Sequence, residues 1–232
     1  MRQLPLDIQL ADYALFETYF DGANASVVHA LRESLLDGST GPGNQLIWLW
    51  GTPESGKSHL LQALVAAAAD LQLRSMWLPF DGIDLGPAML EGMGGLDLIC
   101  IDDVQVVAGQ AEWERALFRL FEDSMQQGVK LVITANAAPN AVGFQLPDLI
   151  SRMNWGTTFR LQALSDEDSV QALQKRAAWR GLELPAETAR YLLSRVHRSP
   201  GTLFALLDKL DKEALVAQRR LTVPFVKSVL DT

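Results

Sequence analysis

One short stretch of the 232-residue sequence limits the possible folds more than any other: the segment GTPESGKS at residues 51–58. It matches the pattern G-x-x-x-x-G-K-[ST], whose glycines let the chain curl so that backbone N–H groups point inward. The apolar segment QLIWLW (45–50) precedes it, and strong helix formers fill residues 57–70. A strand, this loop and a helix in that order predict a phosphate-binding loop. The alternative is a Gly/Pro turn that only joins the strand to the helix.

Short β-rich segments alternate with helical patterns as far as residue 162. The expected strands are residues 45–50, 74–80, 97–102, 130–135 and 157–162. Residues 111–127, AEWERALFRLFEDSMQQ, show the clearest helical pattern between them. Strands without a polar face that are joined by helices are typical of a parallel sheet covered on both sides. We therefore expect an α/β fold with a five-stranded parallel sheet flanked by helices.

The C-terminal part of the sequence contains only helical patterns. Ser165 is expected to cap the first helix, with Asp168 three residues on at the capping-box spacing. Further helices fit residues 186–197, 201–217 and 223–230, each with a proline near its start. The predicted domains are an extended N-terminal peptide at 1–10, an α/β domain at 11–162 and a small all-α domain at 163–232.

The composition argues against several classes of protein. The net charge of −8 disfavours binding of DNA or RNA by the chain alone, although basic residues in the C-terminal half leave a nucleic-acid surface as an alternative to solvated helix faces. No segment approaches the roughly 18–20 apolar residues of a membrane span, and none resembles a secretory signal. The single cysteine, Cys100, excludes an intramolecular disulfide and reads as a small buried hydrophobe. These features predict a cytoplasmic protein.

Specific roles follow for the polar residues of the predicted site. Lys57 would reach the β- and γ-phosphates, and the Ser58 hydroxyl would bind Mg²⁺. The apolar segment LDLICIDD ends in two carboxylates, which would place Asp102 near the magnesium and Asp103 near the attacking water. The alternative is an ordinary acidic strand end. Asn136 ends the next apolar strand at the edge where ligands bind in open α/β sheets.

Together these motifs resemble those of the AAA+ ATPases, which add an SR pair, here at 151–152, and a helical lid. Within that class, IDDVQ (101–105) and DLISRMNWG (148–156) are similar to the replication initiator DnaA. The whole pattern, including LQALSDED, TLFALLDKL and LTVPFVKSVL, resembles the Hda family of DnaA-related inactivators. The resemblance covers essentially the whole chain.

The resemblance implies a nucleotide site around the loop. The nucleotide would be ADP or ATP with Mg²⁺, although no residue specifies the base. Aromatic faces in residues 12–24, namely Phe16 and Tyr19, would contact that base. The loop residues expected to bind the nucleotide are Gly51, Thr52, Pro53, Glu54, Ser55, Gly56, Lys57, Ser58 and His59.

The resemblance also implies that Arg152 is an arginine finger, presented to a nucleotide in a neighbouring subunit. Such a residue offsets the charge that develops on the transferred phosphoryl group. The alternative is a surface arginine that pairs with Asp148 on the same helix, a contact worth under about 1 kcal/mol.

The first residues of the chain are similar to the hexapeptide with which Hda-type proteins bind the polymerase sliding clamp. In the segment QLPLDI (3–8), Pro5 favours an extended backbone. The side chains expected to enter the clamp are those of Gln3, Leu4, Leu6 and Ile8. The alternative is a terminal segment that packs on its own domain.

Two positions differ from the AAA+ pattern. Asp103 stands where hydrolases usually have glutamate, and its shorter side chain would hold the attacking water less well. The sensor arginine of the family falls at Gly201, which cannot contact a γ-phosphate, and Arg198 is the other candidate. DnaA-like initiators continue into a helix-turn-helix domain, whereas this sequence stops at Thr232. The differences at Asp103 and Gly201 suit a protein that holds a spent nucleotide.

The leading hypothesis is a nucleotide-bound adaptor that docks on the sliding clamp and brings Arg152 to ATP on DnaA, so that initiation of replication is switched off. It would not bind DNA strongly by itself, and a homodimer or homo-oligomer stays open. A second hypothesis is an autonomous AAA+ ATPase, such as a helicase loader or a clamp-loader-like protein. A third, a P-loop metabolic kinase, explains the loop but neither the SR pair nor the N-terminal segment.

Overall fold

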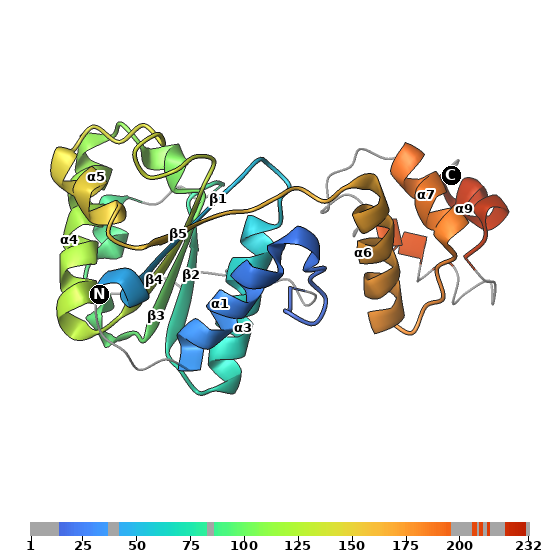
Figure 1. Ribbon diagram of the computed structural model, residues 1–232, viewed down its shortest axis with the longest axis horizontal. Helices are drawn as coiled ribbons and strands as arrows, with labels where there is room; N and C mark the ends of the chain where they lie inside the picture. The colour runs from blue at the N-terminus through green and yellow to red at the C-terminus, as the bar shows by residue number, and fades with distance from the viewer. Residues whose placement is uncertain are drawn as a thin grey trace.

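The computed structural model describes most of the chain. The described residues are 14–36, 42–82, 86–195, 206–207, 209–210, 213 and 221–230. The predicted clamp-binding segment 3–8, Arg198 and Gly201 lie outside them. The described elements form an α/β part and a helical part, which a single connection joins after the last strand (Figure 1).

The centre of the α/β part is a sheet of five strands in the order β2-β3-β4-β1-β5. The strands are β1 (Leu46–Trp50), β2 (Ser75–Pro79), β3 (Leu98–Asp102), β4 (Lys130–Ala135) and β5 (Thr157–Arg160). Every neighbouring pair is parallel. The predicted fold class, a five-stranded parallel sheet flanked by helices, is therefore confirmed.

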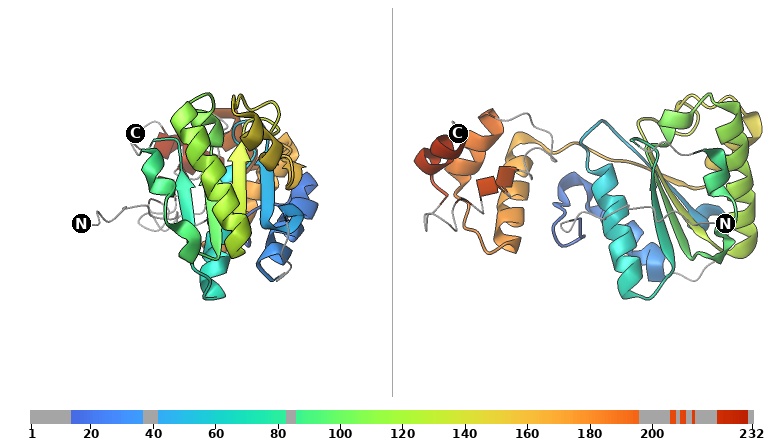
Figure 2. Two further views of the ribbon diagram at one scale, coloured as in Figure 1. Left: turned by 90° about the vertical axis from the view of Figure 1, so that its left-hand side faces the viewer. Right: turned by 180° about the vertical axis from the view of Figure 1, so that it is seen from behind.

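Helices cover both faces of this sheet. The α/β part contains α1 (Ala25–Leu36), α2 (Pro42–Gln45), α3 (Lys57–Asp70), α4 (Ala111–Gln127) and α5 (Pro147–Met153). Its short 3-10 helices are η1 (Gly22–Asn24), η2 (Pro87–Leu90), η3 (Met93–Gly95) and η4 (Val104–Val107). Helices α1 and α3 lie on one face, and α4 and α5 lie on the other (Figures 1 and 2).

Burial on both faces explains why the strands are apolar throughout. Successive side chains of a strand point to opposite faces, so β1 contributes to two cores. Leu46 and Trp48 pack in the core beneath α4 and α5, whereas Ile47 and Leu49 pack in the core beneath α1 and α3. Trp48 is completely buried, and its indole N–H donates to the carbonyl oxygen of Ala137 at 3.0 Å. Each such large apolar side chain contributes about 1.5–3 kcal/mol on burial.

The strand order decides what meets at the carboxyl edge of the sheet. Strand β1 lies between β4 and β5, and β4 lies between β1 and β3. The loop that follows β1 is therefore two strands away from the acidic end of β3. Because all strands are parallel, both segments leave the sheet at the same edge, where open α/β sheets bind ligands.

The helical part contains α6 (Asp166–Trp179), α7 (Ala186–Arg195) and α9 (Val223–Leu230), which share an apolar core. The predicted capping box at its start is confirmed, because Ser165 Oγ accepts from the backbone N–H of Asp168 at 3.1 Å and the Asp168 carboxylate accepts from that of Ser165 at 3.3 Å. No helix within the described ranges is long and apolar enough to cross a membrane.

Gly156 tests the packing between the start of β5 and β1. A Cβ atom there would lie 2.5 Å from both Cγ and the carbonyl oxygen of Leu46, so something in the strand pair must move. We expect Gly156→Ala to lower the free energy of unfolding by about 1–3 kcal/mol, the usual cost of overpacking. Denaturation in urea measures it.

Gly86→Ala is the matched control, because Gly86 has an extended backbone and nothing lies within 4 Å of the added Cβ. It should change stability by no more than about 0.5 kcal/mol. Equal stability of the two variants would contradict the packing described here.

Candidate nucleotide-binding site

The loop after β1 needs glycine at its last turn. Gly56 has a φ of +89° and immediately precedes α3. A Cβ atom there would lie 2.8 Å from Cε2 of Tyr19. At the other end of the loop, the N–H of Gly51 donates to the carbonyl oxygen of Ala135 at 3.3 Å, which continues the pairing of β1 with β4. The loop is therefore held at both ends, with the N-terminus of α3 facing its interior.

Lys57 lies within the curl of this loop. Its side chain is buried, and Nζ donates to the carbonyl oxygens of Gly51 at 3.2 Å and Thr52 at 3.0 Å. Burial lowers its pKa, and the nearby carboxylates of Asp103 and Asp102 oppose that shift. The ammonium is thus fixed by loop carbonyls that phosphate oxygens could replace as acceptors. Its role in phosphate binding stays a prediction.

Asp102 ends β3 as a buried carboxylate that is only 3% exposed. Its Oδ1 accepts from the Thr134 hydroxyl at 2.5 Å, and its carboxylate also accepts from the Ser58 hydroxyl. Burial raises its pKa, and these two hydrogen bonds oppose that shift. The structure therefore brings the two predicted magnesium ligands, Ser58 and Asp102, into contact across the loop.

The oxygen atoms of Ser58 and Asp102 suit a Mg²⁺ ion that also binds phosphate and water, rather than a metal ion held by protein ligands alone. Within the described residues, no group of three or more His, Cys, Asp or Glu side chains could hold a metal. Mg²⁺ usually binds one or two protein ligands together with substrate phosphates and water. A hydroxyl and a carboxylate beside a phosphate-binding loop match that requirement.

Asp103 and Asn136 lie at the same edge in different settings. Asp103 has a φ of +56°, its N–H donates to Thr134 Oγ1 at 2.9 Å, and its Oδ1 accepts from Nε2 of Gln105 at 2.9 Å. Asn136 follows β4 and is exposed. Thr134, a contact of both acidic residues, was not among the predicted site residues, because it reads as an ordinary β-branched strand residue.

A cavity adjoins the loop and reaches the helical part. It is lined by Thr18, Tyr19, Phe20, Glu54, Ser55, Gly56, His59, Leu164 and Ala172. Ser55 Oγ is buried there, and none of the described residues hydrogen-bonds it. A buried polar atom without a partner at a cavity wall is a position where a ligand can supply the missing hydrogen bond. The cavity therefore offers a ligand a hydrogen-bonding position at Ser55, between the loop and α6.

The two aromatic residues predicted to contact a base are placed differently. Tyr19 lines the cavity, with its hydroxyl 3.3 Å from Nδ2 of Asn24, and burial raises its pKa to about 12. Phe16 does not line this cavity. It is buried in the core with α1 and α3, where the guanidinium carbon of Arg32 lies 4.8 Å from its ring centroid.

His59 is a neutral part of the same wall. Its Nε2–H donates to the carbonyl oxygen of Leu15 at 2.9 Å, and its ring meets that of Tyr19 edge to face at 5.3 Å. Its pKa is lowered to about 4, chiefly by burial; the hydrogen bond to Leu15 opposes this shift, and the charges of Arg176 and Lys175 add to it. The imidazole therefore supports residues 15–19 beside the loop and carries no charge at neutral pH.

Polar contacts tie residues 19–24 to the connection after β5 and to α6. Asn24 is 1% exposed, its Nδ2 donates to the carbonyl oxygen of Gln162 at 2.9 Å, and its Oδ1 accepts from the N–H of Gln162 at 2.8 Å. Lys175 of α6 donates to the carbonyl oxygen of Tyr19. Neither Asn24 nor Lys175 was predicted as a site residue, because each acts on a backbone group far away in the sequence.

Arg152 lies in the last turn of α5, and its side chain is 29% exposed. Its Nε donates to Oε1 of Glu122 on α4 at 2.7 Å. Its guanidinium carbon lies 4.0 Å from the ring centroid of Trp155, which is 47% exposed. The predicted alternative, an ion pair with Asp148 on the same helix, is wrong. Arg152 pairs instead with Glu122, which the packing of α5 against α4 brings close.

These features define a P-loop NTPase of the AAA+ class: an open parallel sheet, a glycine-rich loop after β1, an acidic end to β3 and a helical lid. Comparison with family models narrows this class. The model described as "Hda, lid domain" matches residues 166–230, and the one described as "Bacterial DnaA ATPAse domain" matches residues 88–160. The chain is an Hda/DnaA-related AAA+ protein, in a nucleotide-binding, replication-related family.

Solved structures share the fold at low identity. Domain III of the replication initiation protein DnaA from Thermotoga maritima is 20% identical, with 97% of this chain and 98% of that chain covered and a TM-score of 0.77. AMPPCP-bound DnaA from Aquifex aeolicus is 20% identical, with coverage of 88% and 67% and a TM-score of 0.67. A RuvB mutant from Thermotoga maritima is 17% identical, with coverage of 91% and 68% and a TM-score of 0.67.

Lys57→Ala tests the loop. We expect the variant to lose ADP binding in titration calorimetry, because Lys57 is the cation that the carbonyl oxygens of Gly51 and Thr52 hold inside the loop's curl. Saturating ADP at about 100 times its dissociation constant should stabilise the wild type by about 2.7 kcal/mol and the variant not at all. Lys227→Ala removes the same charge from α9 and should behave as wild type. Wild-type ADP affinity in Lys57→Ala would show that the site is elsewhere.

His59 predicts a pH dependence of stability without nucleotide. Because its folded pKa of about 4 is below the unfolded value of 6.5, the unfolded chain binds the proton more readily between these values. The contribution of His59 to the free energy of unfolding is complete above pH 6.5. As the pH falls to 4, about 3 kcal/mol of this contribution is lost. Urea denaturation at several pH values from 4 to 7 measures this effect. The free energy of unfolding should change less with pH in His59→Gln than in the wild type. An unchanged slope, equal to that of the exposed control His29→Gln, would refute the assignment.

Proposed function

We propose that the chain is a nucleotide-bound adaptor that docks on the DNA polymerase sliding clamp and stimulates ATP hydrolysis by DnaA, and so negatively regulates the initiation of replication. The observation that carries the proposal is Arg152, which Glu122 and Trp155 hold at the surface of the α/β part. The family match of residues 166–230 to an Hda lid domain supports the same function. These partners and steps belong to the cytoplasm.

The bound nucleotide in this proposal is ADP or ATP. DnaA from Aquifex aeolicus, which shares the fold, is described as AMPPCP-bound, and AMPPCP is an ATP analogue. The loop, Lys57 and the Ser55 hydroxyl, which none of the described residues hydrogen-bonds, would hold it here. Ser58 and Asp102 would hold Mg²⁺, which when bound neutralises phosphate charge. The nucleotide in this site would fix the arrangement of loop, N-terminal segment and lid.

Arg152 would act on a nucleotide bound to another subunit. The hydrogen bond from Nε to Glu122 and the stacking on Trp155 fix the plane of the guanidinium. The terminal guanidinium nitrogens can then meet two phosphate oxygens, which is the geometry that arginine provides and lysine does not. A donor that is already oriented costs no reorganisation when charge develops. In known NTPases, an arginine finger raises the rate about 10³–10⁵-fold.

Slow turnover by the chain itself is consistent with the setting of Asp103. Its carboxylate accepts from Gln105, and its side chain is one methylene shorter than that of the usual glutamate. Gly201, the expected position of the sensor arginine, lies outside the described residues. We therefore propose that the chain holds its nucleotide, while hydrolysis takes place on DnaA.

The N-terminal segment 3–8 would supply attachment to the clamp. Its similarity to a clamp-binding hexapeptide is the support for this part of the proposal. Tethering on a clamp that is already loaded on DNA would raise the local concentration of Arg152 near DnaA. Attachment and charge stabilisation would then reside in separate parts of the chain.

An autonomous AAA+ ATPase remains the second candidate, because the fold is also shared with RuvB, described as a Holliday junction branch migration motor. That function needs turnover without DnaA. Steady-state ATP hydrolysis by the chain alone faster than about 1 s⁻¹ would favour it.

The two parts of the proposed function can be separated by mutation. Arg152→Ala should abolish stimulation of DnaA and leave clamp binding and ADP binding unchanged, because only transition-state stabilisation is lost. Gln3→Ala with Leu6→Ala should abolish clamp binding and leave ADP binding and the fold unchanged. The assay is ATP hydrolysis by DnaA with clamp loaded on DNA and each variant added in turn.

Arg190→Ala, on the exposed side of α7, is the control for loss of an arginine and should stimulate as the wild type does. Full stimulation by Arg152→Ala, or clamp binding by the double variant, would overturn the proposed function.

A further inference from the structure

Glu114 is a buried carboxylate outside the nucleotide site. It lies in the first turn of α4 and is 1% exposed. Its Oε1 accepts from the N–H of Gly109 at 2.7 Å, and its Oε2 accepts from the N–H groups of Gln145 at 2.9 Å and Leu146 at 2.6 Å. Burial of an unpaired carboxylate is costly, whereas several backbone N–H donors compensate it. This arrangement is a specific anchor for two backbone segments.

One of these segments follows the acidic end of β3, and the other leads into the helix that carries Arg152. Gly109 follows η4, which begins directly after Asp103 at the carboxyl edge of the sheet. Leu146 immediately precedes α5, the helix that carries Arg152 in its last turn. One side chain therefore fixes the end of the η4 turn and the start of the α5 helix. An arginine at the far end of a short helix moves when the near end moves.

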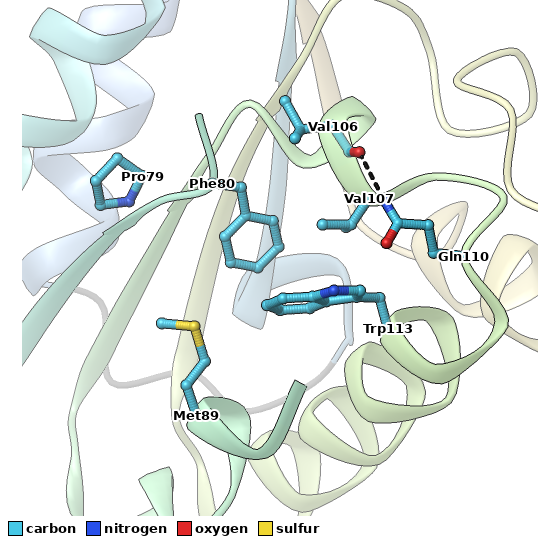
Figure 3. Close-up of a pocket in the computed structure, with 7 residues that line it drawn as sticks. All are labelled: Pro79, Phe80, Met89, Val106, Val107, Gln110 and Trp113. Atoms are coloured by element: carbon cyan, nitrogen blue, oxygen red, sulfur yellow. Dashed lines mark hydrogen bonds between the residues drawn. The ribbon is translucent and has the colours of Figure 1, made fainter. Parts of the chain in front are cut away.

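The start of α4 is itself held firmly, so that Glu114 is a fixed point. Figure 3 shows the ring of Trp113 beside that of Phe80, and their centroids are 5.1 Å apart. Gln110 donates through Nε2 to the carbonyl oxygen of Val106 in η4 at 3.0 Å. Helix α4 is thus attached to the end of β2 and to η4 before the carboxylate reaches across to α5.

We propose that Glu114 is a positioning residue for Arg152, which sets the place of α5 relative to the carboxyl edge of the sheet. The inference rests on the proposed function of Arg152 as an arginine finger. Glu114 contacts neither nucleotide nor partner in this scheme and acts only through the backbone at Gln145 and Leu146. Its loss should therefore reduce the rate of the stimulated reaction and leave the affinities unchanged.

Glu114→Gln is the test, because the side chain keeps its size and exchanges one acceptor oxygen for an NH₂ group that faces backbone donors. We expect the maximal rate of ATP hydrolysis by DnaA that the variant stimulates to fall at least tenfold below that with the wild type. The concentration for half-maximal stimulation and the dissociation constant of ADP should change less than twofold. Glu112→Gln removes the same charge from the exposed face of the same turn and should match the wild type.

A second variant distinguishes the proposed positioning effect from a general loss of stability. Val28→Ala creates a cavity in the core on the other face of the sheet, and we expect it to destabilise the fold without lowering the stimulated rate. Hydrogen exchange provides a readout that does not depend on DnaA: the amides of Gln145 and Leu146 should exchange at least tenfold faster in Glu114→Gln than in Glu112→Gln.

Three outcomes remain distinct. If the wild type fails to stimulate DnaA, the proposed function fails, and the exchange measurement still decides whether Glu114 holds the start of α5. If the wild type stimulates and Glu114→Gln does so at the same maximal rate, the positioning role is overturned. An equal loss of rate in Val28→Ala would also overturn it, because stability alone would then explain the effect.

Discussion

The hydroxyl of Thr134 is the contact on which the candidate site depends. It donates to Oδ1 of Asp102 at 2.5 Å and accepts from the N–H of Asp103 at 2.9 Å, so that one side chain joins the end of β3 to β4. The carboxylate of Asp102 is buried, and a buried charge that loses a hydrogen bond costs about 1–3 kcal/mol or more. This contact places both carboxylates opposite Lys57 and Ser58 and so brings the predicted phosphate and magnesium ligands together.

The two faces of the sheet carry different tasks in this account. Helix α3 and residues 18–20 line the candidate nucleotide site on one face, with Tyr19 and His59 beside the loop. On the other face, Glu114 of α4 accepts a hydrogen bond from the backbone at the start of α5, and Glu122 of α4 accepts one from Arg152. A protein that binds one nucleotide and acts on another needs this separation, since the same arginine cannot serve both. The rigid sheet between the two faces keeps their relative positions fixed.

Local patterns allowed much of the fold to be predicted from sequence. Helix α4 occupies residues 111–127 as expected, because its apolar residues repeat at helical spacing, and the capping box at Ser165 needs only residues close in the sequence. Helix α1 was not predicted, and neither were the roles of Thr134, Glu114 and Asn24. Each of these three side chains bonds to residues far away in the sequence, so that its role exists only after the strands have paired.

The central claim is that hydrolysis takes place on DnaA while the chain holds its own nucleotide. The most direct test loads the chain with ATP that carries one radioactive label and DnaA with ATP that carries a second, and follows both labels in a single turnover with clamp on DNA. The account predicts that the label on DnaA becomes ADP only when a chain with Arg152 is present, while the label on the chain converts no faster than in the chain alone. If the ATP bound to the chain were converted to ADP while the ATP bound to DnaA stayed intact, hydrolysis on DnaA would be refuted.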